Sequence, residues 1–193
     1  MAELTLISGP NGSGKTTLSY FLLSKKYLDK QIPLINPDEI QIQENLDELE
    51  ASKKALIFRE KLLLQKADFS IETTLSGNSE LRLVQRAKSL GYRTRIYYIT
   101  TLESQICIDR IKNRVVEGGH NIDDEDVLRR FHRSHQNFLN IVHQIDEIFI
   151  FDNSFINRKF IFSSSNKKSK VISKRYLSPF FSEILKKFEI MES

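Results

Sequence analysis

Hydrophobic positions along the chain fall into two kinds of pattern. Short apolar runs indicate buried strands, and longer stretches with apolar residues about 3.6 positions apart indicate helices. The short runs predict strands at 4–8, 32–36, 69–71, 93–100 and 147–151. The longer stretches predict helices at 16–26, from 38 onward, and at 51–66, 79–90, 104–117 and 123–144. This alternation predicts an α/β fold, with a mostly parallel sheet and helices on both faces.

The pattern changes after Asp152. Short apolar runs at 159–162 and 170–172 flank a turn rich in Ser, Asn and Lys, which predicts a β-hairpin, and a terminal helix is predicted after Pro179. We therefore expect a core at residues 1–154, with a basic hairpin and terminal helix at 155–193 appended to the same domain.

Composition restricts the class of protein. The chain has 193 residues, 40% of them hydrophobic and 28% charged, which suits a globular domain with a sizeable core. A single cysteine excludes an intramolecular disulfide and any zinc site built on paired cysteines. No apolar run is long enough to span a membrane, and the first residues lack the basic region and cleavage site of a signal peptide. We expect a cytoplasmic protein.

The formal net charge of +4 is unevenly distributed. Residues 1–152 carry a net charge of −2, whereas the segment 153–182 has seven basic residues and no acidic one. A basic segment is a candidate surface for a polyanion, although exposed lysine often serves only solubility.

A glycine-rich segment carries the strongest chemical signal. Residues 9–16, Gly-Pro-Asn-Gly-Ser-Gly-Lys-Thr, match G-x-x-x-x-G-K-[ST] at every fixed position, between a predicted strand and a predicted helix. Backbone N–H groups in such a loop surround phosphate oxygens, the lysine reaches the β- and γ-phosphates, and the threonine hydroxyl binds Mg²⁺. The sequence therefore predicts a nucleoside triphosphate site, with Thr16 as metal ligand. The predicted nucleotide-binding residues are Gly9, Asn11, Gly12, Ser13, Gly14, Lys15, Thr16 and Thr17.

Other motifs narrow the class of nucleotide-binding protein. A guanine-specific switch protein carries N-K-x-D, but the Asn-Lys pair at 166–167 is followed by Lys and Ser. The D-x-x-G pattern of its second switch is also absent, and large motor ATPases need a longer chain. Of the classes of nucleotide-binding protein considered, a small kinase-like phosphotransferase remains.

Carboxylates after two predicted strands are candidates for the acceptor site and the metal. Ligands of an open α/β sheet gather at the carboxyl ends of its strands, where Asp38 and Glu72 are expected. A kinase needs such a carboxylate to orient and deprotonate the acceptor hydroxyl. The alternative for Asp38 is a helix N-cap after Pro37. Asp152 is either a Walker-B-like acid or a turn residue.

Two arginine-bearing helices predict a closing lid at about 104–144. Arg110 and Arg114 share one helix face, Arg130 and Arg133 form a second stripe, and Gly-Gly-His at 118–120 joins the two helices. Arginines of a lid reach the transferred phosphate in the transition state. The alternative is two surface helices whose arginines pair with the acidic run 123–126. A histidine pair in the second helix, His132 and His135, has no matching carboxylate pattern, so we expect no metal site there.

Taken together, these segments resemble the zeta toxin family of P-loop kinases in its small, compact form. The matching segments are 9–17, 35–40 (Ile-Asn-Pro-Asp-Glu-Ile), 71–76 (Ile-Glu-Thr-Thr-Leu-Ser), 114–120 (Arg-Val-Val-Glu-Gly-Gly-His), 129–134 with Asn137, and 152–154. They follow the family's order over roughly residues 3–154. The chain is shorter than the long toxins, and Asn-Pro precedes the aspartate in place of the more usual small residue.

The resemblance implies an ATP-dependent kinase whose acceptor, in the best-known members, is a sugar hydroxyl of UDP-N-acetylglucosamine. It implies that Asp38 is the base that takes the acceptor proton and that Glu72 and Thr74 line the acceptor site. Arg114, with either Arg129 or Arg130, is implied to contact the transferred phosphate. We therefore expect ATP and Mg²⁺ as cofactors, a small-molecule substrate such as a nucleotide sugar, and a separate antitoxin as a partner.

Two alternatives keep the nucleotide site and change the partner. The basic segment would suit a nucleic-acid-associated ATPase, and the acceptor would be a nucleic-acid 5′-hydroxyl in a polynucleotide kinase. Few aromatic residues are interleaved with the lysines of the segment, which disfavours nucleic acid as a partner. No membrane partner is expected.

Overall fold

The computed structural model describes residues 1–119, 121–165, 168–172 and 178–190. The elements run in the order β1 (Glu3–Ser8), α1 (Lys15–Ser24), β2 (Leu34–Ile35), α2 (Pro37–Glu44), α3 (Glu48–Leu64), β3 (Phe69–Thr73), α4 (Ser79–Ser89), β4 (Arg93–Thr100), α5 (Ser104–Val116), α6 (Asp124–Ile141), the 3₁₀ turn η1 (Val142–Gln144), β5 (Glu147–Asp152), β6 (Lys159–Ser165), β7 (Lys168–Val171) and α7 (Pro179–Lys187). Every predicted strand and helix is present.

The strand β2 is shorter than the predicted strand at 32–36, and its two neighbours explain why. Pro33 has no backbone N–H to donate, and only its carbonyl joins the ladder, accepting from Ser70 N at 2.8 Å. Asn36 leaves the strand to cap α2, with its side chain accepting from Asp38 N at 3.0 Å. Leu34 and Ile35 are left as the paired residues.

The strands form one seven-stranded sheet in the order β2-β3-β1-β4-β5-β6-β7. The first five strands are parallel to their neighbours, and the hairpin of β6 and β7 extends the sheet in antiparallel fashion. This confirms the α/β fold with a mostly parallel sheet. The turn residues 166–167 of the hairpin lie outside the described part of the chain.

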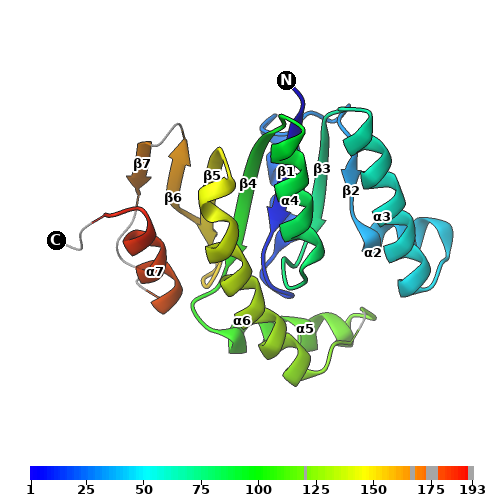
Figure 1. The fold of residues 1–193 in the computed structure, drawn as a ribbon. Coiled ribbons are helices and arrows are strands. Elements are labelled where there is room, and N and C mark those ends of the chain that lie inside the picture. The colour runs from blue at the N-terminus through cyan, green and yellow to red at the C-terminus, as the bar shows by residue number, and fades with distance from the viewer. Residues whose placement is uncertain (120, 166–167, 173–177, 191–193) are drawn as a thin grey trace.

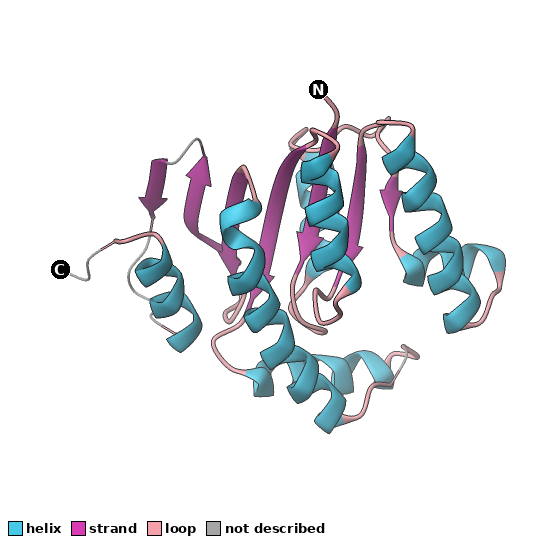
Figure 2. Cartoon of the chain, in the orientation of Figure 1, coloured by secondary structure: helices cyan, strands magenta, loops and turns pink. Residues whose placement is uncertain are grey.

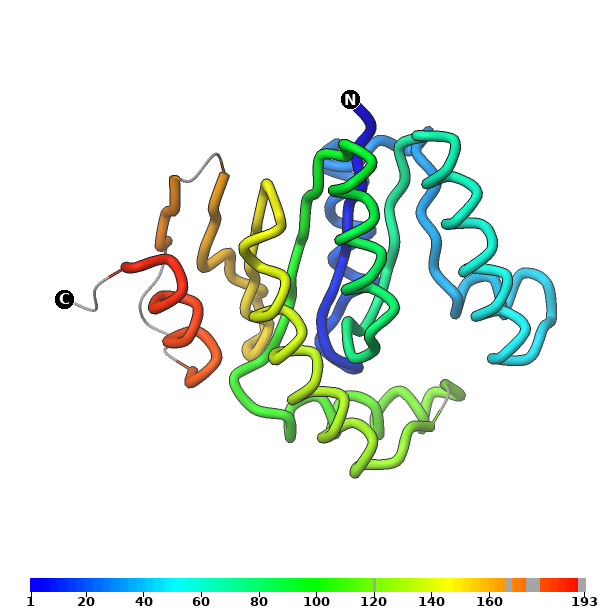
Figure 3. Tube along the Cα trace, viewed as in Figure 1, coloured from blue at the N-terminus to red at the C-terminus, as the bar shows by residue number. Residues whose placement is uncertain are grey.

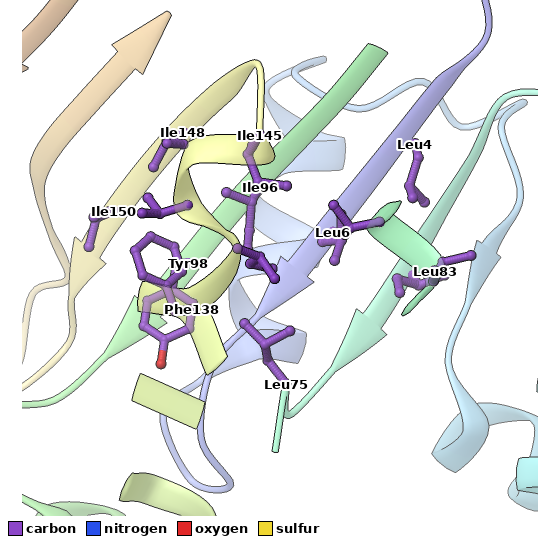
Figure 4. Packing of buried hydrophobic residues seen from close by; sticks show 14 of the residues in the cluster. Leu4, Leu6, Leu75, Leu83, Ile96, Tyr98, Phe138, Ile145, Ile148 and Ile150 are labelled. Carbon is purple, nitrogen blue, oxygen red and sulfur yellow. The ribbon is translucent and has the colours of Figure 1, made fainter. Parts of the chain in front are cut away.

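Consecutive residues of the central strands face opposite sides of the sheet, and each side is covered by helices (Figures 1 and 2). Leu6 and Tyr98 belong to the core beneath α3, α4, α6 and α7, where Phe138 of α6 packs (Figure 4). Ile7 and Tyr97 belong to the smaller core beneath α1. The terminal helix α7 contributes four buried residues to the first core, Phe180, Phe181, Ile184 and Leu185.

The helix α5 and the first part of α6 lie beyond the carboxyl ends of the parallel strands, and the rest of α6 runs along the face of the sheet (Figure 3). A separate apolar cluster joins them, made of Cys107, Ile108 and Ile111 from α5 and Val127 and Phe131 from α6. The predicted lid is therefore a packed helical pair at the edge where ligands of such sheets bind. Among the described residues, no helix is long and apolar enough to cross a membrane.

Candidate active site

The glycine-rich loop lies between β1 and α1, and close contacts dictate its glycines. Gly12 has a φ of +73°, and a Cβ there would lie 2.6 Å from the carbonyl oxygen of Cys107 in α5. Gly14 has a φ of +99°, and a Cβ there would lie 2.6 Å from Nδ2 of Asn153. Gly14 is the N-cap of α1 and provides no side-chain cap. The first N–H groups of the helix are thus left for an anion.

A hydrogen bond from Asn153, which follows β5, holds the glycine-rich loop in place. The amide of Asn153 donates to Ser13 O at 2.8 Å, and Arg110 of α5 donates to Asn153 O at 2.7 Å. Asp152 is the buried last residue of β5, accepts a hydrogen bond from Ser154 N at 2.9 Å, and lines neither of the two cavities of this site. The role of Arg110 in holding the loop was not predicted, although its helix face was.

Lys15 crosses the loop from the first turn of α1. Its Nζ donates to the carbonyl of Pro10 at 3.1 Å, and the negative charges of Glu72 and Asp38 act on it. Burial lowers the pKa of Lys15, and the two carboxylates oppose this shift. The structure thus places the predicted lysine and both predicted carboxylates in one electrostatic unit.

Glu72 lies at the end of β3 next to α1 and is 8% exposed. Its two carboxylate oxygens accept hydrogen bonds from the hydroxyls of Thr16 and Ser19, each at 2.8 Å. Oxygen donors of this kind are the ligands that Mg²⁺ prefers, so the Thr16–Glu72 pair fits a magnesium site. Ser19 was missed by the sequence analysis, although its position one turn after Thr16 places both hydroxyls on one helix face.

Asp38 is exposed in the first turn of α2, and its capping alternative is wrong. Asn36 is the N-cap and Pro37 occupies the first helical position, so the carboxylate of Asp38 is left for the cavity that it lines. Burial raises the pKa of the neighbouring Glu39, and the charges of Glu72 and Asp38 raise it further. Three carboxylates therefore lie close together on this side of the loop.

A cavity of about 1240 Å³ joins the loop to α2, α5 and α6. Its walls carry Asn11, Gly12, Gly14, Lys15, Thr16 and Thr17 from the predicted nucleotide site, together with Asp38, Glu72, Arg110, Arg114 and Arg130. Gly9 and Ser13 lie behind this surface. Gly9 N donates to Thr73 O at 3.3 Å, which ties the loop to β3.

The two glycines after α5 close the helix and position Arg114. Gly118 has a φ of +90° and donates to Val115 O at 3.0 Å, and Gly119 donates to Arg114 O at 2.9 Å, which is a Schellman cap. A Cβ on Gly119 would lie 2.7 Å from Cγ of Arg114, so only glycine leaves room for that side chain. The third motif residue, His120, lies outside the described residues.

The structure separates the two candidate arginines of α6. The side chain of Arg129 is 54% exposed, pairs with Asp126 at 2.6 Å and does not line the cavity or the smaller recess beside it. The side chain of Arg130 is 32% exposed, lies 3.7 Å from Asp126 and lines both cavities. Both arginines thus pair with Asp126 of the acidic run, Arg129 at the shorter distance, and Arg130 is the one of the two that also lines the cavities.

A smaller recess of about 300 Å³ adjoins the cavity and shares Lys15, Asp38, Glu72 and Arg130 with it. Some of its other polar walls follow predicted strands, Asn36 after β2 and Thr73 and Thr74 at the end of β3. The walls that were not predicted come from the helices, Gln41 from α2, Glu48, Ser52 and Arg59 from α3, and Ser79 and Glu80 from the start of α4. We call this space the recess.

His135, one of the two histidines of the predicted pair in α6, makes contacts that hold α6 in the structure. His135 shares a 2.7 Å hydrogen bond with the hydroxyl of Thr100 and stacks on Phe180 at 4.0 Å between ring centroids. Burial lowers the pKa of His135 to about 3, with a smaller contribution from His132. The described residues contain no group of three His, Cys, Asp or Glu side chains able to hold a metal ion.

Comparison with known proteins identifies the family to which the chain is similar. The family model for zeta toxin matches residues 2–169. An uncharacterized protein of Haemophilus influenzae is 34% identical over 128 residues, which are 64% of this chain and 88% of that protein.

Two solved structures share the fold at low identity. A chain of the AvrRxo1-ORF1:-ORF2 complex with ATP superposes with a TM-score of 0.68 at 17% identity, over 97% of this chain and 63% of that one. A chain of the PezAT chromosomal toxin–antitoxin system of Streptococcus pneumoniae superposes with a TM-score of 0.63 at 18% identity, over 97% and 84% of the two chains. This chain thus spans less than two thirds of the AvrRxo1 chain. Because the family model covers most of its length, the chain belongs to the zeta toxin family.

Proposed function

We propose that the protein is an ATP-dependent kinase that transfers the γ-phosphate to an alcohol group of a small molecule. The observation that carries this proposal is that one cavity is lined by Lys15 and Asp38 together with Arg114 of α5 and Arg130 of α6. Membership of the zeta toxin family supports the same activity, and the AvrRxo1 complex was solved with ATP.

The groups around the cavity divide the chemistry between them. The loop N–H groups and Lys15 bind the β- and γ-phosphates, and Asp38 takes the proton of the acceptor hydroxyl as its oxygen attacks the γ-phosphorus. The bond from the γ-phosphorus to the bridging oxygen breaks, and ADP leaves with that oxygen. Arg114 and Arg130 neutralise the charge on the transferring group. Thr16 and Glu72 would hold Mg²⁺, which would supply charge neutralisation for the triphosphate.

The acceptor enters the recess, which begins where Asp38 meets the larger cavity. A cyclic polyol such as the sugar of a nucleotide sugar suits its hydroxyl and carboxylate walls, and the nucleotide part would lie in the wider cavity. UDP-N-acetylglucosamine is therefore the first acceptor to test. Glu72 bonds Thr16 and Ser19, so its proposed role lies nearer the metal than the acceptor, whereas Thr74 lines the recess.

The test is a substrate screen with purified full-length protein, ATP and Mg²⁺, followed by mass spectrometry for a gain of one phosphate. The panel contains UDP-N-acetylglucosamine, other nucleotide sugars, free sugars, polyols and an oligonucleotide with a 5′-hydroxyl. Phosphate gain on a small alcohol supports the proposal. Gain on the oligonucleotide alone would move the function to a polynucleotide kinase, and no gain on any member would overturn it.

A separate antitoxin is the proposed protein partner. The support is the family and the PezAT structure, which belongs to a toxin–antitoxin system. Co-purification of the tagged protein with the products of adjacent reading frames tests this, and recovery of the protein alone would count against it.

A further inference from the structure

The recess is lined by an ion pair that no sequence motif predicted. Arg59 of α3 and Glu80 of α4 approach to 3.3 Å between Nη1 and Oε1, with side chains only 11% and 12% exposed. Ser79 Oγ donates to the same Oε1 at 2.7 Å. Both members of the pair, and Ser79, line the recess.

The pair retains hydrogen-bonding capacity. The guanidinium of Arg59 has five N–H donors, and its one hydrogen bond to a described residue is the bond to Glu80. Its Nε is buried without a partner. Glu80 Oε1 accepts two hydrogen bonds, whereas Oε2 accepts none from the described residues. Both side chains therefore keep hydrogen-bonding capacity beyond their own ion pair, and both line the recess.

The charges around the pair disfavour one class of ligand. Four carboxylates line the recess, from Asp38, Glu48, Glu72 and Glu80, against three cations, from Lys15, Arg59 and Arg130, and Arg59 is already paired with Glu80. A carboxylate or phosphate that entered would meet a lining with more negative than positive groups, which is unfavourable in a confined space. Hydroxyl and amide groups carry both a donor and an acceptor and match the capacity of the two side chains without this repulsion.

We propose that the Arg59–Glu80 pair selects the acceptor, binding the uncharged hydroxyl or amide end of the molecule and rejecting acceptors that carry an anionic group there. This inference rests on the proposed kinase function and adds the chemical class of group that enters the recess. Arg59 and Glu80 act as positioning residues, since neither is placed at the reacting atoms.

The competing role is structural, because the pair also joins α3 to α4. The chain supplies a matched control for that role. Arg86 and Glu60 join the same two helices at 2.6 Å between Nη1 and Oε2, with side chains 48% and 36% exposed, and they line neither cavity. Loss of the Arg86–Glu60 pair weakens the contact between α3 and α4 without changing the lining of either cavity, and so tests the structural role alone.

The experiment measures kcat/KM for acceptors that differ in one carboxylate, UDP-glucose against UDP-glucuronate and glucose against glucuronate, with UDP-N-acetylglucosamine as a further neutral acceptor. For the wild type we expect at least about a tenfold preference for the neutral member of a pair. In Glu80→Gln that preference falls at least about fivefold, with KM for ATP within about twofold of wild type. Glu60→Gln keeps the wild-type preference. Thermal unfolding confirms that each variant is folded.

Arg59→Lys provides a second variant that keeps the charge and loses the planar fork of donors. We expect its KM for neutral acceptors to rise about fivefold to tenfold with kcat within about twofold, which a general loss of structure would not produce. If the wild type phosphorylates no acceptor, the proposed function fails and this inference fails with it. If the wild type is active but Glu80→Gln and Glu60→Gln have equal selectivity, the inference alone is overturned.

Discussion

The two sides of the cavity are built in different ways. The phosphate side comes from one continuous segment, residues 9–17, whose glycines are dictated by contacts with α5 and with Asn153. The acceptor side comes from segments far apart in the sequence, with Asp38 on α2, Arg59 on α3 and Glu80 on α4. Binding of a phosphate chain is thus encoded locally, whereas selection of the acceptor depends on how the helices pack.

The two sides also differ in charge. The phosphate side offers Lys15 and an uncapped helix N-terminus, both of which attract anions. The recess has four carboxylates in its lining against three cations, one of which, Arg59, is paired with Glu80. This difference in charge is the basis for our proposal that a polyanionic donor and an uncharged acceptor group bind on different sides.

Lys15→Met should have the largest effect, because it removes the cation of the phosphate side. We expect kcat/KM to fall about 10³-fold and KM for ATP to rise. The check is steady-state phosphate transfer together with ATP binding by calorimetry. Near-normal ATP affinity and transfer would show that the loop does not bind the triphosphate as proposed.

Asp38→Asn tests the acceptor side with the phosphate side intact. Loss of the base should lower kcat about 10²-fold or more, while the affinity for ATP stays within about twofold. Single-turnover transfer and ATP binding measured on the same preparation separate the two effects. A normal transfer rate would assign the proton to another group, and an equal loss of ATP affinity would remove the distinction between the two sides.

Arg130→Ala and Arg129→Ala form a matched pair on α6. Arg130 lines both cavities, so its loss should lower kcat about 10²-fold. Arg129 is exposed and paired with Asp126, so its loss should change kcat less than about twofold. Steady-state kinetics at saturating ATP provide the check, and similar losses in both variants would contradict the separation of their roles.

Gly119→Ala should act on transfer through Arg114. The added methyl group would lie 2.7 Å from Cγ of Arg114 and displace its side chain, so we expect kcat to fall about tenfold. Gly118→Ala is the control. Its Cβ meets no atom within 4 Å, but a φ of +90° costs about 1 kcal/mol of stability for alanine. A Cβ on Gly119 would also lie 2.9 Å from the carbonyl oxygen of Arg114, so both variants should lose stability in chemical denaturation, whereas only Gly119→Ala should lose kcat.

The phosphate side of the cavity could be predicted from the sequence more completely than the acceptor side. The loop, Lys15 and Thr16 form a contiguous motif, and Asp38 and Glu72 were predicted from their positions after strands. The helix start at Asn-Pro-Asp was also predictable, but the N-cap is Asn36, whereas the sequence analysis considered Asp38 as the alternative for that role. Arg59 and Glu80 could not be predicted, because α3 and α4 bring them together across 21 positions and neither belongs to a local pattern.

His135 should have the smallest effect on catalysis, because it supports the helical side without lining either cavity. Its pKa is about 3 in the folded protein, against an ordinary value of 6.5, so the unfolded chain binds its proton more readily. Its contribution to stability is therefore complete above about pH 6.5 and is lost as the pH falls toward 3, with a slope of at most about 1.4 kcal/mol per pH unit. His135→Gln keeps a polar group near Thr100 and removes the proton site, so its stability should depend less on pH between 7 and 4.5. Urea denaturation across that range is the measurement. His132→Gln, on an exposed neighbour, should keep the wild-type slope, and an equal loss of slope in both variants would show that His135 is not the group responsible.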